Sequence, residues 1–379
     1  MPPEHSTLAP RRQSIETISI WALIITLVVA IFAFIPSTAV PFATTKTFLL
    51  AAGALVTLAL YILARLGRGN VILPPFALVG ALWLPVIAYA LSATFSGALF
   101  TSALWGSALE PDTLGFMLVA TIIGTLTAFA LRRPDHYRSF LNMSAWVFGA
   151  IVALQVLIII VGQAAPNTIS PSFSIIGSFE DLAFLVGLGV IGILITLREL
   201  NLSQRTHYIR VAILAGALFL LAIANSTPTW TLVALISLGL FVEAIMQRKS
   251  KSSDSDLDGA AIMDEAPTET DEGSRSLIIP LCVLAVSIFF LIPAIGSQQN
   301  DNLSNRLAEG LHINVLNVRP SWQSTLAVGQ KVYSSSPVFG SGPGTFGVEW
   351  LKYRDPLLNA TAFWNIDFSS GIGFIPTSF

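Results

Sequence analysis

Long apolar runs separated by short polar stretches constrain this chain more than any other feature of its sequence. Nine runs occur, each close to the ~20 residues with which an α-helix crosses about 30 Å of hydrocarbon. The ionisable residues within them, Lys46, Asp181 and Glu243, lie near run ends. Because backbone groups must be hydrogen-bonded inside lipid, and because the runs do not alternate as membrane β-strands do, the sequence predicts transmembrane helices. The nine predicted spans cover residues 18–35, 46–64, 73–92, 114–131, 140–162, 181–197, 211–227, 230–247 and 277–296.

The composition excludes most other classes of protein. Charged residues make up 11% of the chain, whereas soluble globular chains carry about 25%. So few charges would not cover the surface of a soluble protein, and a net charge of −2 gives no argument for nucleic-acid binding. The single cysteine, Cys282, excludes an intramolecular disulfide and a cysteine-rich metal site. We therefore expect an all-α, polytopic membrane protein rather than a soluble enzyme, a disordered chain or a disulfide scaffold.

The basic residues predict the orientation of the chain. The first apolar run exceeds the 7–15 residues of a signal-peptide core, so it is expected to remain as a helix. With residues 1–17 placed in the cytoplasm, 14 of the 20 basic residues fall in cytoplasmic segments, as the positive-inside rule requires. Five of the other six lie in residues 297–370. The pattern predicts a multi-pass protein with a cytoplasmic N-terminus and one large outer loop.

Two further segments differ from the spans in composition. Residues 248–276 are acidic and rich in serine, which predicts a disordered cytoplasmic linker between an eight-helix bundle at 18–247 and the ninth span at 277–296. Residues 371–379 are apolar but too few to cross a bilayer. We expect them to begin a tenth helix, and we therefore expect the chain to be a fragment of a longer protein.

Sequence signatures of several familiar chemistries are missing. The four histidines form no H-x-x-x-H pair, and neither a P-loop nor a G-x-S-x-G motif occurs. No ionisable residue lies at mid-membrane depth, where proton relays and ion sites are usually found. We therefore expect no metal and no cofactor, and neither ATP-driven nor proton-coupled transport by this chain alone.

The outer loop contains a predicted amphipathic helix. Arg319 precedes a proline, and from Trp322 onward apolar or small residues recur at +4, +7 and +11, ending at Tyr333. This spacing predicts a helix over 320–333 that lies at the membrane surface. A plain interfacial helix accounts for the pattern. Arg319 at its start is also placed to bind a phosphate, since a guanidinium donates two parallel hydrogen bonds.

Alternating glycines follow this helix at Gly340, Gly342 and Gly344. Spaced glycines let successive N–H groups point the same way, so one interpretation is an anion-binding nest and the other is a tight turn. Aromatic residues then stand among polar ones. That composition suits sugar rings and a membrane interface equally well.

The stretch from Arg319 to Phe346 resembles the O-antigen ligase/polymerase superfamily. In this pattern an Arg and a Trp open a helix, and a proline, a hydrophobic residue and a spaced-glycine turn ending in Phe follow it. Members of the superfamily are polytopic bacterial membrane proteins that use lipid-linked oligosaccharides on the outer face. The many predicted helices and the single large outer loop late in the chain are similar to the architecture of that family.

The resemblance implies a glycosyltransferase of the C-type membrane fold in the bacterial inner membrane. It would move a glycan from undecaprenyl diphosphate to a glycan or lipid acceptor, without a nucleotide sugar, and its other partners would be membrane lipids. Arg319 is then the expected cation for the diphosphate, with Arg306 and Arg354 as secondary candidates. The family has a His after the glycine turn, where this chain has none, and Asp367 is the candidate base. The remaining substrate-binding candidates are Trp322, Gly340, Gly342 and Gly344.

Two other functions stay open. A transporter of glycan or hydrophobic substrates would need polar groups at helix midpoints, which the sequence lacks. A non-catalytic membrane assembly protein would account for the missing His. It would also account for the missing Arg in the short outer loop at 225–229, where the family often has one.

Overall fold

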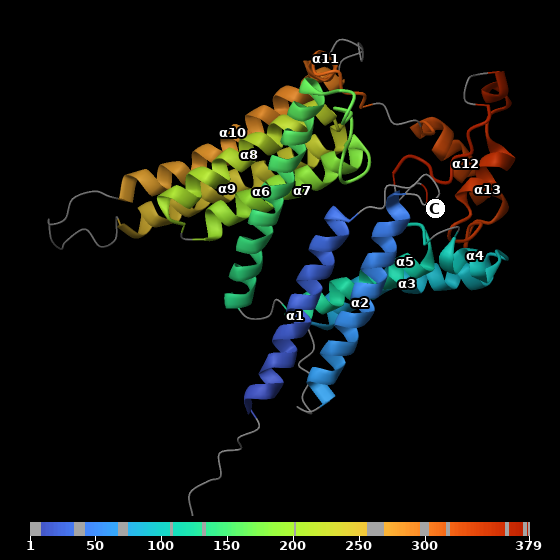
Figure 1. The fold of residues 1–379 in the computed structure, drawn as a ribbon, viewed down its shortest axis with the longest axis horizontal. Helices are drawn as coiled ribbons and strands as arrows, with labels where there is room; N and C mark the ends of the chain where they lie inside the picture. Colours follow the sequence, from blue (N-terminus) through green and yellow to red (C-terminus); the bar gives the residue numbers. More distant parts are fainter. Residues whose placement is uncertain are drawn as a thin grey trace, which may run out of the picture. The chain divides into compact units, whose positions relative to one another are not determined.

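The protein is all-helical in the part of the chain that the computed structural model describes (Figure 1). Thirteen α-helices and one 3-10 helix form, with no β-strand among the described residues. They divide into two compact units, the first made of Met1–His136 with Val318–Phe379 and the second of Tyr137–Asn317. The described residues are 9–33, 42–66, 75–106, 109–130, 134–200, 202–255, 269–295, 303–315, 319–360, 364–373 and 377.

The first unit combines long apolar helices from the start of the chain with short helices from its end. Helix α1 packs along α2, and α5 packs against both α2 and α3. The α1–α2 approach is close, because a Cβ added at Gly53 would lie 2.1 Å from Thr26 Cγ2. Small residues allow such approach between membrane helices. The elements are α1 (Ala9–Phe32), α2 (Phe42–Leu66), α3 (Phe76–Phe95), α4 (Phe100–Trp105), α5 (Leu114–Ala130), α12 (Trp322–Ser335), α13 (Phe346–Tyr353) and the 3-10 helix η1 (Pro356–Ala360).

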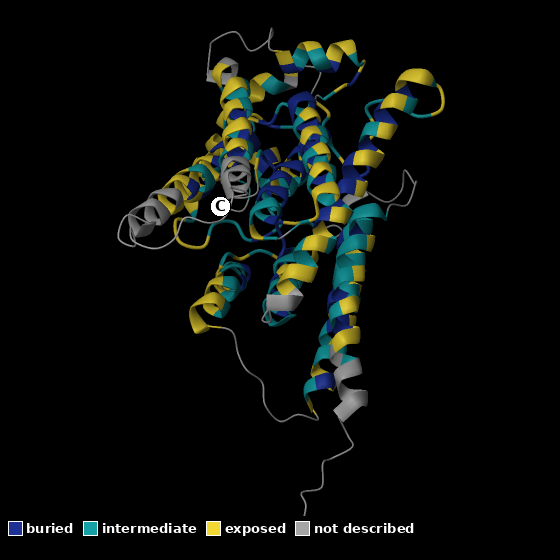
Figure 2. Ribbon diagram, turned by 90° about the vertical axis from the view of Figure 1, so that its left-hand side faces the viewer, coloured by how far each residue is buried: buried dark blue, intermediate teal, exposed yellow. Residues whose placement is uncertain are grey.

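The second unit is a bundle with a continuous apolar core. Leu182 and Val186 of one helix are fully buried, and Trp230 of another is stacked on Phe290 with ring centroids 4.9 Å apart. Most long helices in Figure 2 have buried and exposed residues on different faces, as lipid-facing helices with one packed side should. The elements are α6 (Pro134–Ala164), α7 (Phe179–Glu199), α8 (Gln204–Ala224), α9 (Thr227–Ser255), α10 (Glu269–Ile295) and α11 (Leu303–Gly310).

Two arginines connect helices of the second unit at one end. Arg210 of α8 is 2% exposed, and it donates hydrogen bonds to the carbonyl of Thr196 and to Oδ1 of Asn142. Arg198 of α7 forms a salt bridge with Glu243 of α9 at 2.7 Å. These contacts tie α6, α7, α8 and α9 together through polar groups that range from the buried Arg210 to the exposed Glu243.

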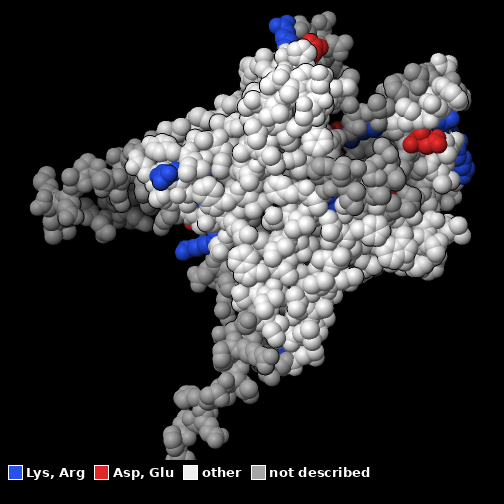
Figure 3. Space-filling view, viewed as in Figure 1, with Lys and Arg blue, Asp and Glu red and all other residues white. Residues whose placement is uncertain are grey.

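The long helices agree with the predicted spans. Each of the nine predicted ranges overlaps one of α1, α2, α3 and α5–α10. Six of these nine are long and apolar enough to cross a membrane, and the other three contain shorter apolar stretches. Charged side chains are sparse on the face drawn in Figure 3. The coarse prediction of a multi-pass, all-α membrane protein therefore agrees with the structure.

Helices extend into the predicted linker and into the predicted N-terminal segment. Helix α9 continues to Ser255 and α10 begins at Glu269, so both enter the predicted linker at 248–276, and α1 enters the predicted N-terminal segment. Adding a residue to an existing helix costs less than starting one, which favours such extensions. Residues 256–268 lie outside the described part of the chain.

Contacts within each unit group the segments that were predicted to share one side of the membrane. In the first unit, the N–H of Gly344 donates to the carbonyl of Asp112 at 3.1 Å. In the second, the N–H of Asn314 donates to Ser172 Oγ at 2.7 Å. Both bonds join a short predicted outer loop to the large one. Within each unit the two loops therefore lie beside each other.

The end of the chain packs onto α12 through described residues. The N–H of Ile372 donates to Thr325 Oγ1 at 3.1 Å, and Thr377 Oγ1 donates to the carbonyl of Gly373 at 2.6 Å. Residues 371–373 are not helical. Within the predicted tenth-helix stretch, residues 374–376 and 378–379 lie outside the described part.

Candidate functional site

Helix α12 forms one wall of the candidate site. It begins after Ser321, whose hydroxyl accepts a hydrogen bond from the N–H of Ser324 at 3.1 Å and caps the helix. The predicted helix at 320–333 is therefore present with a shift of two residues. Its buried face contains Thr325, Val328 and Val332. The predicted stripe that starts at Trp322 is the exposed face, and Trp322 itself is 53% exposed.

The glycine turn has a left-handed backbone at three positions. The φ values of Gly340, Gly342 and Gly344 are 63°, 103° and 67°. Side chains with a Cβ rarely adopt such values. The N–H of Gly340 donates to the carbonyl of Ser336, and that of Gly344 to the carbonyl of Asp112, each at 3.1 Å. Two N–H groups of the turn thus hold it in place, which favours the tight-turn interpretation.

The glycine turn docks on the segment that connects α3 to α4. A Cβ on Gly342 would lie 2.5 Å from Ser96 Oγ, so only glycine fits at this contact. Beside it, Ser92 Oγ donates to the carbonyl of Phe339 at 2.7 Å, and the Phe339 ring stacks on Phe95 with centroids 5.2 Å apart. These contacts bring two segments that are distant in sequence to one place.

A small aromatic cluster positions α13 and the segment after it. Phe346 and Trp350 are buried on α13 and pack with Val328 of α12. The Trp350 ring contacts Phe368 edge-on, with centroids 5.4 Å apart. Because Phe368 is anchored in this way, its neighbour Asp367 is held close to α13.

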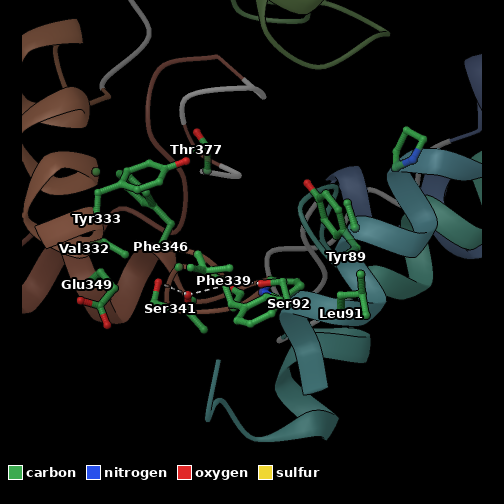
Figure 4. Close-up of a pocket in the computed structure, with 18 of the residues that line it drawn as sticks. Tyr89, Leu91, Ser92, Val332, Tyr333, Phe339, Ser341, Phe346, Glu349 and Thr377 are labelled. Atoms are coloured by element: carbon green, nitrogen blue, oxygen red, sulfur yellow. Dashed lines mark hydrogen bonds between the residues drawn. The ribbon is translucent and has the colours of Figure 1, made fainter. Parts of the chain in front are cut away.

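An apolar cavity of about 570 Å³ lies between α3 and α12, and we call it the apolar cavity. Its walls come from the second half of α3, Met117 of α5, the second half of α12 and the glycine turn. Figure 4 shows Tyr89 and Leu91 of α3 on one side, with Tyr333 and Phe346 on the other. Because α3 is a candidate membrane span, the cavity is suited to an apolar chain.

A second cavity of about 840 Å³, here called the polar cavity, lies between the α3–α5 connection and α13. Three carboxylates line it, Glu110, Glu349 and Asp367, together with Lys352. The Lys352 ammonium lies 3.8 Å from the Glu349 carboxylate. The hydroxyl side chains that line the cavity are Ser96, Ser102, Ser335, Ser336, Ser341, Thr345 and Ser369.

The two cavities share part of their walls. Val332, Ser341, Thr345 and Glu349 line both. The hydroxyls of Ser341 and Thr345 are hydrogen-bonded to each other at 2.8 Å, and the Thr345 hydroxyl also donates to the carbonyl of Gly342 at 2.6 Å. The shared wall therefore includes a hydrogen-bonded turn, with the apolar cavity on one side and the polar cavity on the other.

Two side chains near the polar cavity have shifted pKa values. Burial of Asp112, reinforced by the nearby Glu110 carboxylate, raises the pKa of Asp112 from 3.8 to about 6. Its carbonyl is the acceptor for Gly344, so this carboxyl sits at the docking point of the glycine turn. A hydrogen bond with Tyr353 and the charge of Glu349 raise the pKa of Lys352, which keeps it cationic.

The structure places four of the predicted site residues at these cavities. Asp367 and Gly344 line the polar cavity, and Gly340 and Gly342 line the apolar one. The sequence did not predict that these four residues lie near α3 or the segment that follows it. Their assigned roles in substrate binding and catalysis stay predictions.

The predicted cations lie elsewhere. Arg319 precedes α12, whose other end forms the cavities, and it lines neither of them; burial lowers the pKa of its guanidinium. Arg354 donates to the carbonyl of Trp364 at 3.2 Å and also stands outside both cavities. Trp322 starts the exposed face of α12, and Arg306 belongs to α11 in the second unit.

One side of the polar cavity comes from the first third of the chain and was not predicted from the sequence. Glu110 and the loop residues 96–99 line it, together with Glu349 of α13. No site was predicted in the loop between the third and fourth predicted spans. Its acidic pair, Glu110 and Asp112, was a usable signal, since these two are the only charged residues of residues 93–113.

Comparison of the chain with protein-family models, curated proteins and solved structures gives no match. Among the described residues, no three or more His, Cys, Asp or Glu side chains are grouped so as to hold a metal ion. The candidate site is therefore defined by its own geometry, namely two adjoining cavities, one of which is lined by three carboxylates and a lysine.

Proposed function

We propose that this protein is a membrane glycosyltransferase that moves a glycan from a lipid diphosphate to an acceptor. The observation that carries the proposal is the shared wall between the apolar and the polar cavity, both within the first unit. An amphiphile fits this arrangement, with its chain beside α3 and its hydroxyl-rich head beside α13. Cavities of several hundred Å³ with a few convergent polar groups are typical ligand sites.

The proposed reaction uses Asp367 as the base. The acceptor hydroxyl oxygen attacks the anomeric carbon of the donor sugar, and the bond from that carbon to the diphosphate oxygen breaks. The diphosphate leaves with the bonding electron pair, and the hydroxyl proton passes to the Asp367 carboxylate. A positioned base of this kind contributes typically 10²- to 10⁴-fold.

The resemblance of residues 319–346 to the O-antigen ligase/polymerase superfamily supports the choice of a lipid-linked donor. Within the proposal, undecaprenyl diphosphate is the donor lipid, and the nine spans form a C-type bundle in a bacterial inner membrane with the cavities on its outer face. Arg319 is assigned to the diphosphate, with Arg306 and Arg354 as secondary cations. This assignment rests on the resemblance, because the cavities are formed without these arginines.

Glycan transfer in membranes tests the role of Asp367. Membranes that contain the protein and an undecaprenyl-diphosphate-linked oligosaccharide are incubated with a glycolipid acceptor, and the product is quantified. We expect Asp367→Asn to lower the rate by about 10²-fold or more. Asp355→Asn is the matched control, since Asp355 lines neither cavity. Transfer at the wild-type rate by Asp367→Asn would remove Asp367 from the mechanism, and no transfer by the wild type would favour a transporter or an assembly protein.

Arg319→Ala tests the donor assignment separately. If Arg319 binds the diphosphate, the variant requires a higher donor concentration for half-maximal transfer, while its affinity for the acceptor is unchanged. The donor concentration for half-maximal transfer is also measured for Arg354→Ala, which removes a secondary candidate cation. An unchanged donor dependence in Arg319→Ala would leave that role to another residue.

A further inference from the structure

The polar cavity has a charge pattern that discriminates between possible head groups. Its described lining contains three carboxylates, one lysine and no arginine. The lysine, Lys352, lies beside the Glu349 carboxylate, so its charge is partly compensated. Like charges in a partly enclosed space repel far more strongly than in bulk water. A phosphate or a carboxylate-bearing ligand is therefore disfavoured in this space.

The hydrogen-bonding groups of the polar cavity indicate which class of ligand it binds. Carboxylates only accept hydrogen bonds, whereas hydroxyl groups both donate and accept. The cavity therefore offers a ligand carboxylate acceptors at Glu110, Glu349 and Asp367, beside serine and threonine hydroxyls that can donate or accept. Sugar hydroxyls and ammonium groups supply such donors. The volume of about 840 Å³ is within the range of small-molecule sites.

We propose that the polar cavity binds the acceptor through an uncharged or amine-bearing sugar, and that it excludes the donor diphosphate and acidic sugars. This inference rests on the proposed function and narrows its acceptor to a chemical class. The acceptor chain then occupies the apolar cavity, because the two spaces share the wall at Ser341 and Thr345. The donor diphosphate stays assigned to Arg319, which lies outside the polar cavity.

Three alkyl glycosides with the same chain test this proposal. The full chain is reconstituted in phosphatidylcholine nanodiscs, and binding of dodecyl glucoside, dodecyl glucosaminide and dodecyl glucuronide is titrated at low ionic strength, with empty nanodiscs as the blank. We expect the glucosaminide to bind at least as tightly as the glucoside, and the glucuronide at least ten-fold more weakly. Equal affinities, tighter binding of the glucuronide, or no binding above the blank would each overturn the proposal.

Charge-neutralising variants locate the discrimination. Glu349→Gln and Glu110→Gln are each expected to reduce the difference in affinity between the glucosaminide and the glucuronide to about three-fold or less. Glu309→Gln on α11 is the matched control, because Glu309 is outside the cavity, and it should keep the full gap. A gap that persists in both cavity variants would place the discrimination elsewhere and refute the assignment.

Salt provides a second measurement on the unaltered chain. Raising the ionic strength from about 0.01 M to about 1 M shortens the Debye length roughly ten-fold. The preference for the amine over the carboxylate should therefore shrink by several-fold in the wild type, and a preference that is independent of salt would contradict the proposal. The transfer assay separates the two ideas. Normal head-group discrimination without glycan transfer refutes the proposed function, whereas transfer without discrimination refutes only this inference.

Discussion

Buried polar side chains hold helices together in the second unit, whereas in the first unit polar side chains surround open space. Arg210 is almost fully buried and bonds to two neighbouring helices, and Arg198 is paired with Glu243. In the first unit, Glu110 and Asp367 line a cavity instead. Polar side chains thus serve packing in the second unit and line binding space in the first, and substitutions in each unit test this division.

The largest expected effect is on the stability of the second unit. Leu182 is 0% exposed, so Leu182→Ala should lower the free energy of unfolding by about 2–5 kcal/mol through a lost contact and a residual cavity. Leu84 of α3 is 66% exposed and lines the apolar cavity. Leu84→Ala should change stability by less than about 1 kcal/mol and instead weaken dodecyl glucoside binding. Denaturant titration in micelles measures both, and equal destabilisation would remove the distinction between the units.

A comparable effect with a pH dependence is expected at Asp112. Its pKa is raised from 3.8 to about 6 in the folded state, so the folded protein holds this proton more tightly than the unfolded chain. The resulting stability is fully present below pH 3.8 and is lost as the pH rises through about 6. Asn is neutral at every pH, so Asp112→Asn should be more stable than the wild type at pH 7 by up to about 3 kcal/mol.

Thermal unfolding of purified protein across this pH interval measures the Asp112 effect. The difference between Asp112→Asn and the wild type should vanish below pH 3.8 and reach a plateau above about 6. Asp355→Asn serves as the control for a carboxyl outside the cavities. A difference that does not vary with pH would contradict the assignment to Asp112.

A smaller and more local effect is expected at the glycine turn. Gly342→Ala combines a left-handed φ with a Cβ that would lie 2.5 Å from Ser96 Oγ. We expect a cost of roughly 1–3 kcal/mol and a weaker docking of the turn, seen as lost binding in both cavities. Gly239→Ala in α9 meets no atom within 4 Å and should be neutral or stabilising. Unchanged alkyl glycoside binding by Gly342→Ala would show that the turn is not required for either cavity.

The smallest effect is expected at the salt bridge between Arg198 and Glu243. The Glu243 side chain is 55% exposed, and exposed ion pairs contribute about 0–1 kcal/mol. Glu243→Gln should therefore lower the unfolding free energy by less than about 1 kcal/mol, with no change in transfer or head-group preference. A loss of several kcal/mol in the denaturant titration would indicate that this pair is more central to the bundle than its exposure suggests.

Local sequence patterns were sufficient for the helices but not for the cavities. The length of each apolar run predicted a long helix, and the spacing from Trp322 to Tyr333 predicted α12, because both signals lie within one element. The polar cavity combines Glu110 with Asp367, and no local pattern indicates that these two segments meet. The ends of α9 and α10 were missed for another reason. Helix ends depend on cooperative extension, which the composition of the linker did not reveal.

The discontinuous course of the first unit has a consequence for biogenesis. Ser92 and its partner Phe339 are separated by 247 positions in the chain. At about 5–20 residues per second, a ribosome needs roughly 12–50 s to synthesise that stretch. The cavity walls that come from residues 84–117 are therefore synthesised before the second unit, and the segment that completes them is synthesised after it. Assembly of the site is therefore a late event, because the segment from residue 318 onward that completes both cavities is synthesised after the whole second unit.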